Sequence, residues 1–204
     1  MYGREAEVLP PPTTLDVHGP RRPIEGIDAG FVMVVGRLQG YKNVGHVVEA
    51  FRLLPHVRLV VVGDGPQRHH LEHAAPSNVT FLGRVSDEEL RWLYASCAAL
   101  VSASYEDFGL TPVEAALYGK PSALLRFGGF LDTTIEGVTG VFFDHVEPWA
   151  IAQGVRTVLH ERWDPIEIAL TAERFSEAGF TARLHAIVDA TVGSASPGLA
   201  ASGR

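Results

Sequence analysis

Short apolar runs alternate along this chain with longer stretches in which apolar residues recur at helical intervals. Each run has the length of a strand and has few polar positions within it. A continuous apolar run predicts a strand that is buried on both faces, as in a parallel sheet. The runs that we interpret as strands are residues 31–35, 57–62, 79–82, 98–103, 121–125 and 140–143.

The stretches between the runs predict helices, and some begin with recognisable N-terminal signals. Asn43 is a plausible N-cap, and Ser86 with Glu89 predicts a capping box. The predicted helices are 43–54, 66–75, 86–96, one opening at 111, 148–161, 166–176 and 181–191. Strands that alternate with helices in this way predict an α/β fold with a doubly wound, Rossmann-like parallel sheet.

In such folds ligands bind beyond the carboxyl ends of the strands. The residues that follow the predicted strands are therefore the candidate ligand-binding residues. They are Gly36-Arg37 with Lys42, Gly63-Asp64-Gly65, Gly83-Arg84-Val85, Glu106, and Gly128-Gly129.

One of these loops carries two acids and leads into a helix. Thr111 predicts the N-cap, Pro112 the first helical position and Glu114 the third. The free N–H groups of a helix N-terminus attract anions such as phosphate. Glu106 and Glu114 bracket these donors, which suits a ligand with both phosphate and hydroxyl groups, such as a sugar nucleotide. The plain alternative is that Glu114 only completes a capping box and Glu106 is a solvated loop acid.

Composition excludes several classes of function. The net charge of −7 argues against nucleic acid as a partner. No apolar run approaches the roughly 20 residues that a membrane helix needs. The first residues have no apolar core of a signal peptide, and the single Cys97 can form no internal disulfide, so we expect a cytoplasmic protein. His69 and His73 lack further metal ligands, and no metal site is expected.

The order of motifs along residues 1–192 resembles that of retaining glycosyltransferases of the GT-B fold, family 4. These motifs are Gly36-Arg37-Leu38, Lys42, Gly63-Asp64-Gly65, Leu82-Gly83, Glu106-x7-Glu114, Gly119-Lys120-Pro121 and Gly128-Gly129. The resemblance implies one GT-B half-domain with C-terminal helices. It implies a connector over 1–28 and a sugar-nucleotide-binding domain over 29–192. The small and polar composition of the last residues predicts a disordered tail over 193–204.

The same resemblance implies roles for individual residues, with no cofactor and no metal. Arg37 and Lys42 would bind and stabilise the leaving diphosphate. Glu106 would accept hydrogen bonds from the donor sugar, together with backbone groups of Phe108 and Gly109. Other positions would contact the rest of the donor. The N–H groups of Leu110 and Thr111 would hold the phosphate, Glu114 would bind the ribose, and Gly83-Arg84-Val85 would lie against the base. The glycines Gly36, Gly63, Gly128 and Gly129 would line the site.

Family members have a second, N-terminal domain that binds most of the acceptor, and we expect that half to be missing here. The chain would then be a donor-binding half, inactive or incomplete without an acceptor domain in the same or another chain. The donor would be GDP-mannose or a related nucleotide sugar, and the acceptor a glycan or lipid-linked sugar. Contact with a membrane surface would come only through the missing half. Two alternatives remain: a stand-alone nucleotide-sugar-binding module without catalysis, and half of a GT-B-fold sugar-nucleotide epimerase.

Overall fold

The computed structural model describes residues 9–194, and the chain divides into two compact units. The larger unit, Leu15–Ala172, contains the whole sheet. Its strands are β1 (Val32–Val35), β2 (Leu59–Val62), β3 (Val79–Gly83), β4 (Ala99–Ser102), β5 (Ser122–Leu125) and β6 (Gly140–Phe143). Its helices are η1 (Gly40–Lys42), α1 (Val44–Ala50), η2 (Phe51–Leu53), α2 (Arg68–Ala74), α3 (Asp87–Ser96), α4 (Leu110–Leu117), α5 (Phe130–Thr133), α6 (Pro148–His160) and α7 (Pro165–Ala172).

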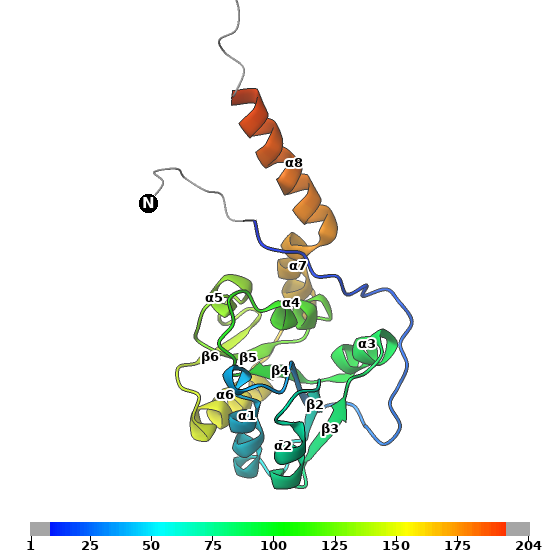
Figure 1. Cartoon of the computed structure of the whole chain (residues 1–204), viewed down its shortest axis with the longest axis vertical. Coiled ribbons are helices and arrows are strands. Elements are labelled where there is room, and N and C mark those ends of the chain that lie inside the picture. Colours follow the sequence, from blue (N-terminus) through cyan, green and yellow to red (C-terminus); the bar gives the residue numbers. More distant parts are fainter. Residues whose placement is uncertain (1–8, 195–204) are drawn as a thin grey trace, which may run out of the picture. The chain divides into compact units, whose positions relative to one another are not determined.

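The six strands form one parallel sheet in the order β3-β2-β1-β4-β5-β6 (Figure 1). The chain therefore builds outward from β1 to one edge, returns, and continues from β4 to the other edge. The doubly wound Rossmann-like sheet expected from the sequence is confirmed. Its strand order reverses between β1 and β4, which is the place where ligands bind in such sheets.

The strands are apolar throughout because both faces of the sheet are covered. On one face Val32, Val61 and Val101 pack with residues of α1 and α6, which lie side by side in Figure 1. On the other face, Met33 and Leu100 pack with residues of α3 and with Ala115 of α4. Parallel strands covered in this way read as continuous apolar runs.

Local sequence explains where several helices begin. The predicted capping box of α3 is present, with Ser86 Oγ accepting from the Glu89 N–H and the Glu89 carboxylate accepting from the Ser86 N–H. The helix predicted over 166–176 is instead two pieces, α7 and the 3-10 turn η3 (Glu173–Phe175). Trp163 lies between α6 and α7, where its indole N–H donates to the Val158 carbonyl at 2.8 Å.

Part of the expected connector belongs to the sheet unit. Ile24 and Ile27 pack against the α3 side of the core, and the buried Arg91 guanidinium donates to the Pro20 carbonyl at 2.8 Å. No helix or strand occurs over residues 9–31. Residues 1–8 of the expected connector lie outside the described part of the chain.

The smaller unit combines the described residues 9–14 with η3 and α8 (Glu177–Ser194). Within it, the Thr13 N–H donates to the Phe175 carbonyl at 3.1 Å. Helix α8 includes residues 193–194, the start of the expected tail, and residues 195–204 lie outside the described residues. Among the described helices, none is both long and apolar enough to cross a membrane.

Candidate functional site

The candidate site lies at the reversal of the strand order, where three loops follow three strands. They are the β1–α1 loop (residues 36–43), the β4–α4 loop (103–109) and the β5–α5 loop (126–129), and we call them the Glu106 loops. Because β1 and β4 are adjacent parallel strands, the first two loops leave the sheet at the same edge.

Three consecutive residues of the first loop hold the second loop in place. The Tyr41 carbonyl accepts from the Tyr105 N–H at 3.1 Å. Lys42 forms an ion pair with Glu106. The Asn43 side chain donates to the Ala103 carbonyl at 2.8 Å. Asn43, expected as a simple N-cap, makes no capping hydrogen bond and has a left-handed backbone with φ 52°.

The Glu106 carboxylate is held by a chain of polar side chains. Both Lys42 Nζ and Ser104 Oγ donate to the same oxygen, Oε1, and the distance from Ser104 is 2.9 Å. The Ser104 hydroxyl is in turn 2.9 Å from the Ser102 hydroxyl, and both serines are buried. No described residue donates to Oε2, so this oxygen can still accept hydrogen bonds from a ligand.

We did not identify Ser102 and Ser104 from the sequence, although a signal for them exists. The serines and Glu106 occupy alternate positions, and alternate residues of an extended chain lie on one face. A polar triplet with period two at the end of an apolar strand therefore indicates a connected set of side chains.

The third loop approaches the second so closely that only glycine fits. The Gly129 N–H donates to the Glu106 carbonyl at 2.9 Å. A Cβ atom on Gly129 would lie 2.2 Å from the Phe108 Cα. Gly128 has φ 51°, and its Cβ would lie 2.2 Å from the Glu106 carbonyl oxygen. The glycines expected to line the site thus restrict the backbone from Glu106 to Phe108.

Aromatic rings border this cluster. Tyr105 and Phe127 meet edge to face with centroids 4.9 Å apart, and both are 45% exposed. The Phe130 ring is fully buried beside Gly109, where an added Cβ would lie 2.6 Å from it. Exposed rings next to a held carboxylate offer a ligand both apolar and polar contacts.

The structure corrects the predicted start of α4. Gly109, with φ 78°, is the N-cap, so Leu110 and Thr111 are the first two helical residues and Pro112 is the third. Glu114 therefore lies beyond the third helical position and forms no capping box. Its Oε2 instead accepts from the hydroxyl of Tyr94 on α3 at 2.6 Å.

The Tyr94 contact places Glu114 in a different hydrogen-bonded set from Glu106. Burial raises the pKa of the Glu114 carboxyl, and the hydrogen bond from Tyr94 offsets part of this rise. Burial, together with the nearby Glu114 charge, also raises the pKa of Tyr94 well above its usual range. Glu114 is thus a largely buried acid that keeps its proton to a higher pH than an exposed one.

The remaining predicted residues lie at the ends of β1, β2 and β3. The Gly36 N–H donates to the Val62 carbonyl at 3.0 Å, and the Gly63 N–H donates to the Gly83 carbonyl at 2.8 Å. Backbone hydrogen bonds therefore link the end of β1 to that of β2, and the end of β2 to that of β3.

The two arginines predicted for the site lie at these strand ends. Arg37 and Arg84 are exposed, and neither guanidinium bonds to another described residue, while Val85 is half-buried. The structure therefore pairs Lys42 with Glu106 and leaves Arg37 facing solvent.

The expected absence of a metal site stays a prediction. His69 and His73 both lie on α2 and are exposed. Within residues 9–194, no group of three or more histidine, cysteine or acidic side chains is placed to hold a metal ion. Cys97 is buried in the core between α3 and the sheet, and this burial raises the pKa of its thiol to about 12.

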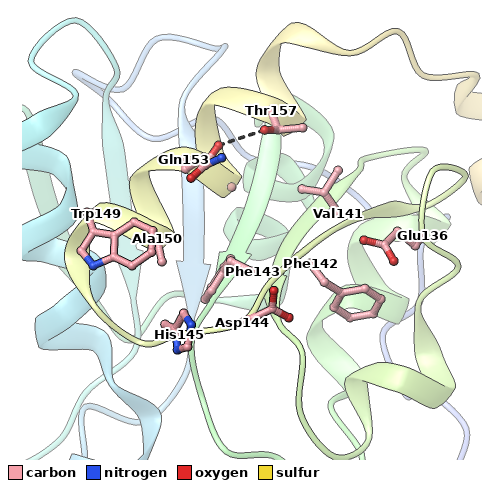
Figure 2. A pocket seen from close by; sticks show the side chains of 11 residues that line it. Glu136, Val141, Phe142, Phe143, Asp144, His145, Trp149, Ala150, Gln153 and Thr157 are labelled. Atoms are coloured by element: carbon pink, nitrogen blue, oxygen red, sulfur yellow. Dashed lines mark hydrogen bonds between the residues drawn. The ribbon is translucent and has the colours of Figure 1, made fainter.

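A separate pocket of about 260 Å³ lies between the edge strand β6 and helix α6 (Figure 2). We call it the β6–α6 pocket. It is lined by Glu136, Val141, Phe142, Phe143, Asp144, His145, Trp149, Ala150, Gln153, Gly154 and Thr157. None of these was predicted from the sequence as a site residue, and Trp149 is 57% exposed.

The strand order and the loops that meet at its reversal place the larger unit among the doubly wound α/β ligand-binding domains. A family model described as "Glycosyl transferases group 1" matches residues 22–181. The chain belongs to this family, so the resemblance of its motif order to that of glycosyltransferases is confirmed.

Curated relatives are longer than this chain. The D-rhamnosyltransferase WbpZ of Pseudomonas aeruginosa is 31% identical over 189 residues, which are 89% of this chain and 49% of that protein. The uncharacterized glycosyltransferase MJ1607 of Methanocaldococcus jannaschii is 32% identical over 143 residues, 66% of this chain and 37% of that protein. The chain thus spans half or less of the length of these relatives.

Solved structures confirm the GT-B fold. The chain is similar to sucrose-phosphate synthase from Thermosynechococcus elongatus, with a TM-score of 0.73, 24% identity, and 92% of this chain and 53% of that chain covered. It is also similar to HepE of Anabaena in complex with UDP, with a TM-score of 0.65, 25% identity, and 79% and 49% covered.

Proposed function

We propose that this chain binds the sugar-nucleotide donor of a retaining glycosyltransferase that transfers a hexose. The observation that carries the proposal is the meeting of the Glu106 loops at the reversal of strand order. There the chain holds a carboxylate with one open oxygen beside the N-terminus of α4. Family membership and the UDP-bound neighbour support a nucleotide diphosphate as part of the ligand.

Each candidate residue has a role in this proposal. Glu106 Oε2 accepts hydrogen bonds from sugar hydroxyls, while Arg37 and Lys42 neutralise the diphosphate as charge grows on it during bond cleavage. The N–H groups of Leu110 and Thr111 face the phosphates. The remaining roles are those implied by the family resemblance. Phe108, Gly109, Gly128 and Gly129 border the sugar, and Gly36 and Gly63 border the phosphates. Arg84 and Val85 contact the base, and Glu114 binds the ribose.

The Lys42–Glu106 ion pair has a consequence for this assignment. Lys42 and Glu106 are both mostly shielded, with side-chain exposures of 16% and 22%. A diphosphate that draws Lys42 toward itself competes with Glu106 for the same ammonium. Arg37, which has no described partner, engages the diphosphate without breaking a contact. We therefore expect Arg37 to account for more of the diphosphate affinity than Lys42.

Mannose as the sugar, GDP as the nucleotide, a metal-free reaction and a cytoplasmic location complete the proposal. Transfer requires donor and acceptor within reacting distance in a site that excludes water. The acceptor, a glycan or a lipid-linked sugar, is therefore assigned to an N-terminal domain in the same or another chain.

Isothermal titration calorimetry with GDP, UDP and ADP and with the matching monophosphates tests this proposal. We expect at least one diphosphate to bind about tenfold or more tightly than its monophosphate, because a charged hydrogen bond is worth about 1.5–3 kcal/mol. Arg37→Ala should remove most of this preference. Arg162→Ala, at another exposed arginine, is the matched control and should leave it unchanged. Equal affinities for mono- and diphosphates in the wild type would overturn the proposal.

A further inference from the structure

The β6–α6 pocket combines side chains that are normally found where a protein binds a sugar. Its lining includes the exposed Trp149 together with Phe143 and Gly154. Around these lie an acid, an amide, an imidazole and a hydroxyl: Asp144, Gln153, His145 and Thr157. Figure 2 shows them coming from β6, from the turn after it and from one side of α6.

Trp149 is the most exposed of the three tryptophans in this unit. It is 57% exposed at the start of α6, whereas Trp92 and Trp163 are half-buried. Its ring lies 6.1 Å from that of His145 and tilted by 42°, so the two rings do not stack face to face. An indole face that no neighbouring ring covers can stack on the apolar face of a sugar ring, because aromatic side chains combine a large apolar surface with a polar edge.

The polar groups are held, yet they retain capacity for a ligand. Arg126 donates to Asp144 Oδ1 at 2.8 Å and to both oxygens of Glu136, at 2.8 and 3.0 Å. These bonds fix the Asp144 carboxylate and leave its Oδ2 without a donor among the described residues. The side-chain amide of Gln153 likewise has no hydrogen-bond partner in the described part of the chain.

The charged side chains at the β6–α6 pocket favour neutral ligands over anionic ones. The ion pairs with Arg126 lower the pKa of Glu136, so it stays ionised, and one arginine faces two carboxylates at this pocket. Glu147 adds a third acid at the N-cap of α6. A pocket with this excess of negative charge disfavours phosphates and nucleotides. At about 260 Å³ it is smaller than sites for drug-sized ligands, which begin near roughly 300 Å³.

We propose that the β6–α6 pocket is a second carbohydrate-binding site, which holds one residue of a neutral glycan against Trp149. The sugar ring stacks on the indole, and its hydroxyls donate to Asp144 Oδ2 and exchange hydrogen bonds with the Gln153 amide. The site does not depend on the roles proposed for the Glu106 loops. It gives this domain a place to hold a glycan chain away from the strand-order reversal.

Nuclear magnetic resonance of the whole chain tests the proposal through the three tryptophan indole N–H signals. Maltotriose and mannotriose serve as neutral glycan probes, and uridine serves as an uncharged ligand that can also stack on indole. We expect at least one trisaccharide at millimolar concentration to shift the Trp149 signal while the Trp92 and Trp163 signals stay in place. Uridine should shift it at least fivefold less at equal concentration.

Variants separate this site from nonspecific effects. Trp149→Ala removes the reporter, so its binding is followed by the backbone signals of residues 141–145. We expect these shifts to fall at least tenfold in Trp149→Ala and severalfold in Gln153→Ala. Leu159→Ala, at another exposed apolar position of α6, should leave them unchanged. No shift with either sugar, a larger shift with uridine, or unaltered shifts in Trp149→Ala would each overturn the proposal.

Discussion

The Glu106 loops and the β6–α6 pocket both follow strands of one sheet, but they are built in opposite ways. At the Glu106 loops the backbones of three loops touch, and the carboxylate is held by buried serines. At the pocket the side chains surround open space, and the largest of them faces solvent. We infer that the first region is fixed by close backbone packing, whereas the exposed side chains of the second, such as Trp149, can change with little effect on the fold.

The strongest test of this difference is Gly129→Ala. The new Cβ would lie 2.2 and 2.3 Å from backbone atoms of Phe108, so two loops must move apart. We expect the free energy of unfolding to fall by about 3 kcal/mol, at the upper end for overpacked sites. Urea unfolding measures this loss. Gly40→Ala is the matched control, because its Cβ would meet nothing within 4 Å, and an equal loss in both variants would contradict the account.

The next largest effect is expected from Ser104→Ala. The variant removes a buried hydroxyl that is bonded to both Ser102 and Glu106, and the Ser102 hydroxyl loses its partner. Loss of one partner of a buried hydrogen bond costs about 1–3 kcal/mol. Thermal and urea unfolding should show a loss of this size, whereas the exposed Ser77→Ala should have none. A wild-type stability for Ser104→Ala would show that the serine pair does not hold the loop.

Glu114 gives an effect that depends on pH. Burial raises its pKa above the ordinary value of 4.5, so the folded chain keeps this proton to a higher pH than the unfolded chain. Its contribution to stability is therefore complete below the unfolded pKa and is lost as pH rises through the folded pKa. The loss amounts to about 1.4 kcal/mol for each pH unit that separates the unfolded pKa from the folded one.

Glu114→Gln should not show this loss. Urea unfolding of both proteins between about pH 4.5 and 8 should give a stability difference that grows in favour of the variant as pH rises. The exposed Glu167→Gln should instead follow the wild type in parallel. Parallel profiles for Glu114→Gln as well would show that the buried carboxyl titrates normally.

Trp149→Ala is expected to change stability least. The side chain is 57% exposed, and surface substitutions usually stay within about 0.5 kcal/mol. Urea unfolding should place the variant within this range of the wild type. A loss above about 2 kcal/mol would mean that Trp149 holds α6 in place and that the pocket is as fixed as the Glu106 loops.

Much of the fold could be predicted because it depends on local patterns. The apolar runs predicted all six strands, and β6 has the predicted bounds, 140–143. The α3 capping box is also confirmed, because both partners lie within four consecutive residues. These features need only neighbouring residues to form, which is why one sequence suffices to find them.

The arrangement of the candidate site depended on distant residues and was predicted less well. Glu114 pairs with Tyr94, twenty positions earlier and on another helix, so the local signal for a capping box was misleading. The start of α4 was misplaced because Gly109, with its positive φ, takes the N-cap position that Thr111 was expected to hold. The β6–α6 pocket gave no sequence signal, since its residues come from several elements and only packing shows which of them stay exposed.

The central claim is that Glu106 contacts the donor sugar, and comparing two ligands with and without this carboxylate tests it most directly. Calorimetry would measure GDP-mannose and GDP, or the preferred nucleotide and its sugar conjugate, with the wild type and Glu106→Gln. We predict that the variant binds the sugar nucleotide about tenfold more weakly and the nucleoside diphosphate about as tightly as the wild type. If the variant binds the sugar nucleotide as tightly as the wild type, or weakens both ligands equally, Glu106 does not contact the sugar and the account is wrong.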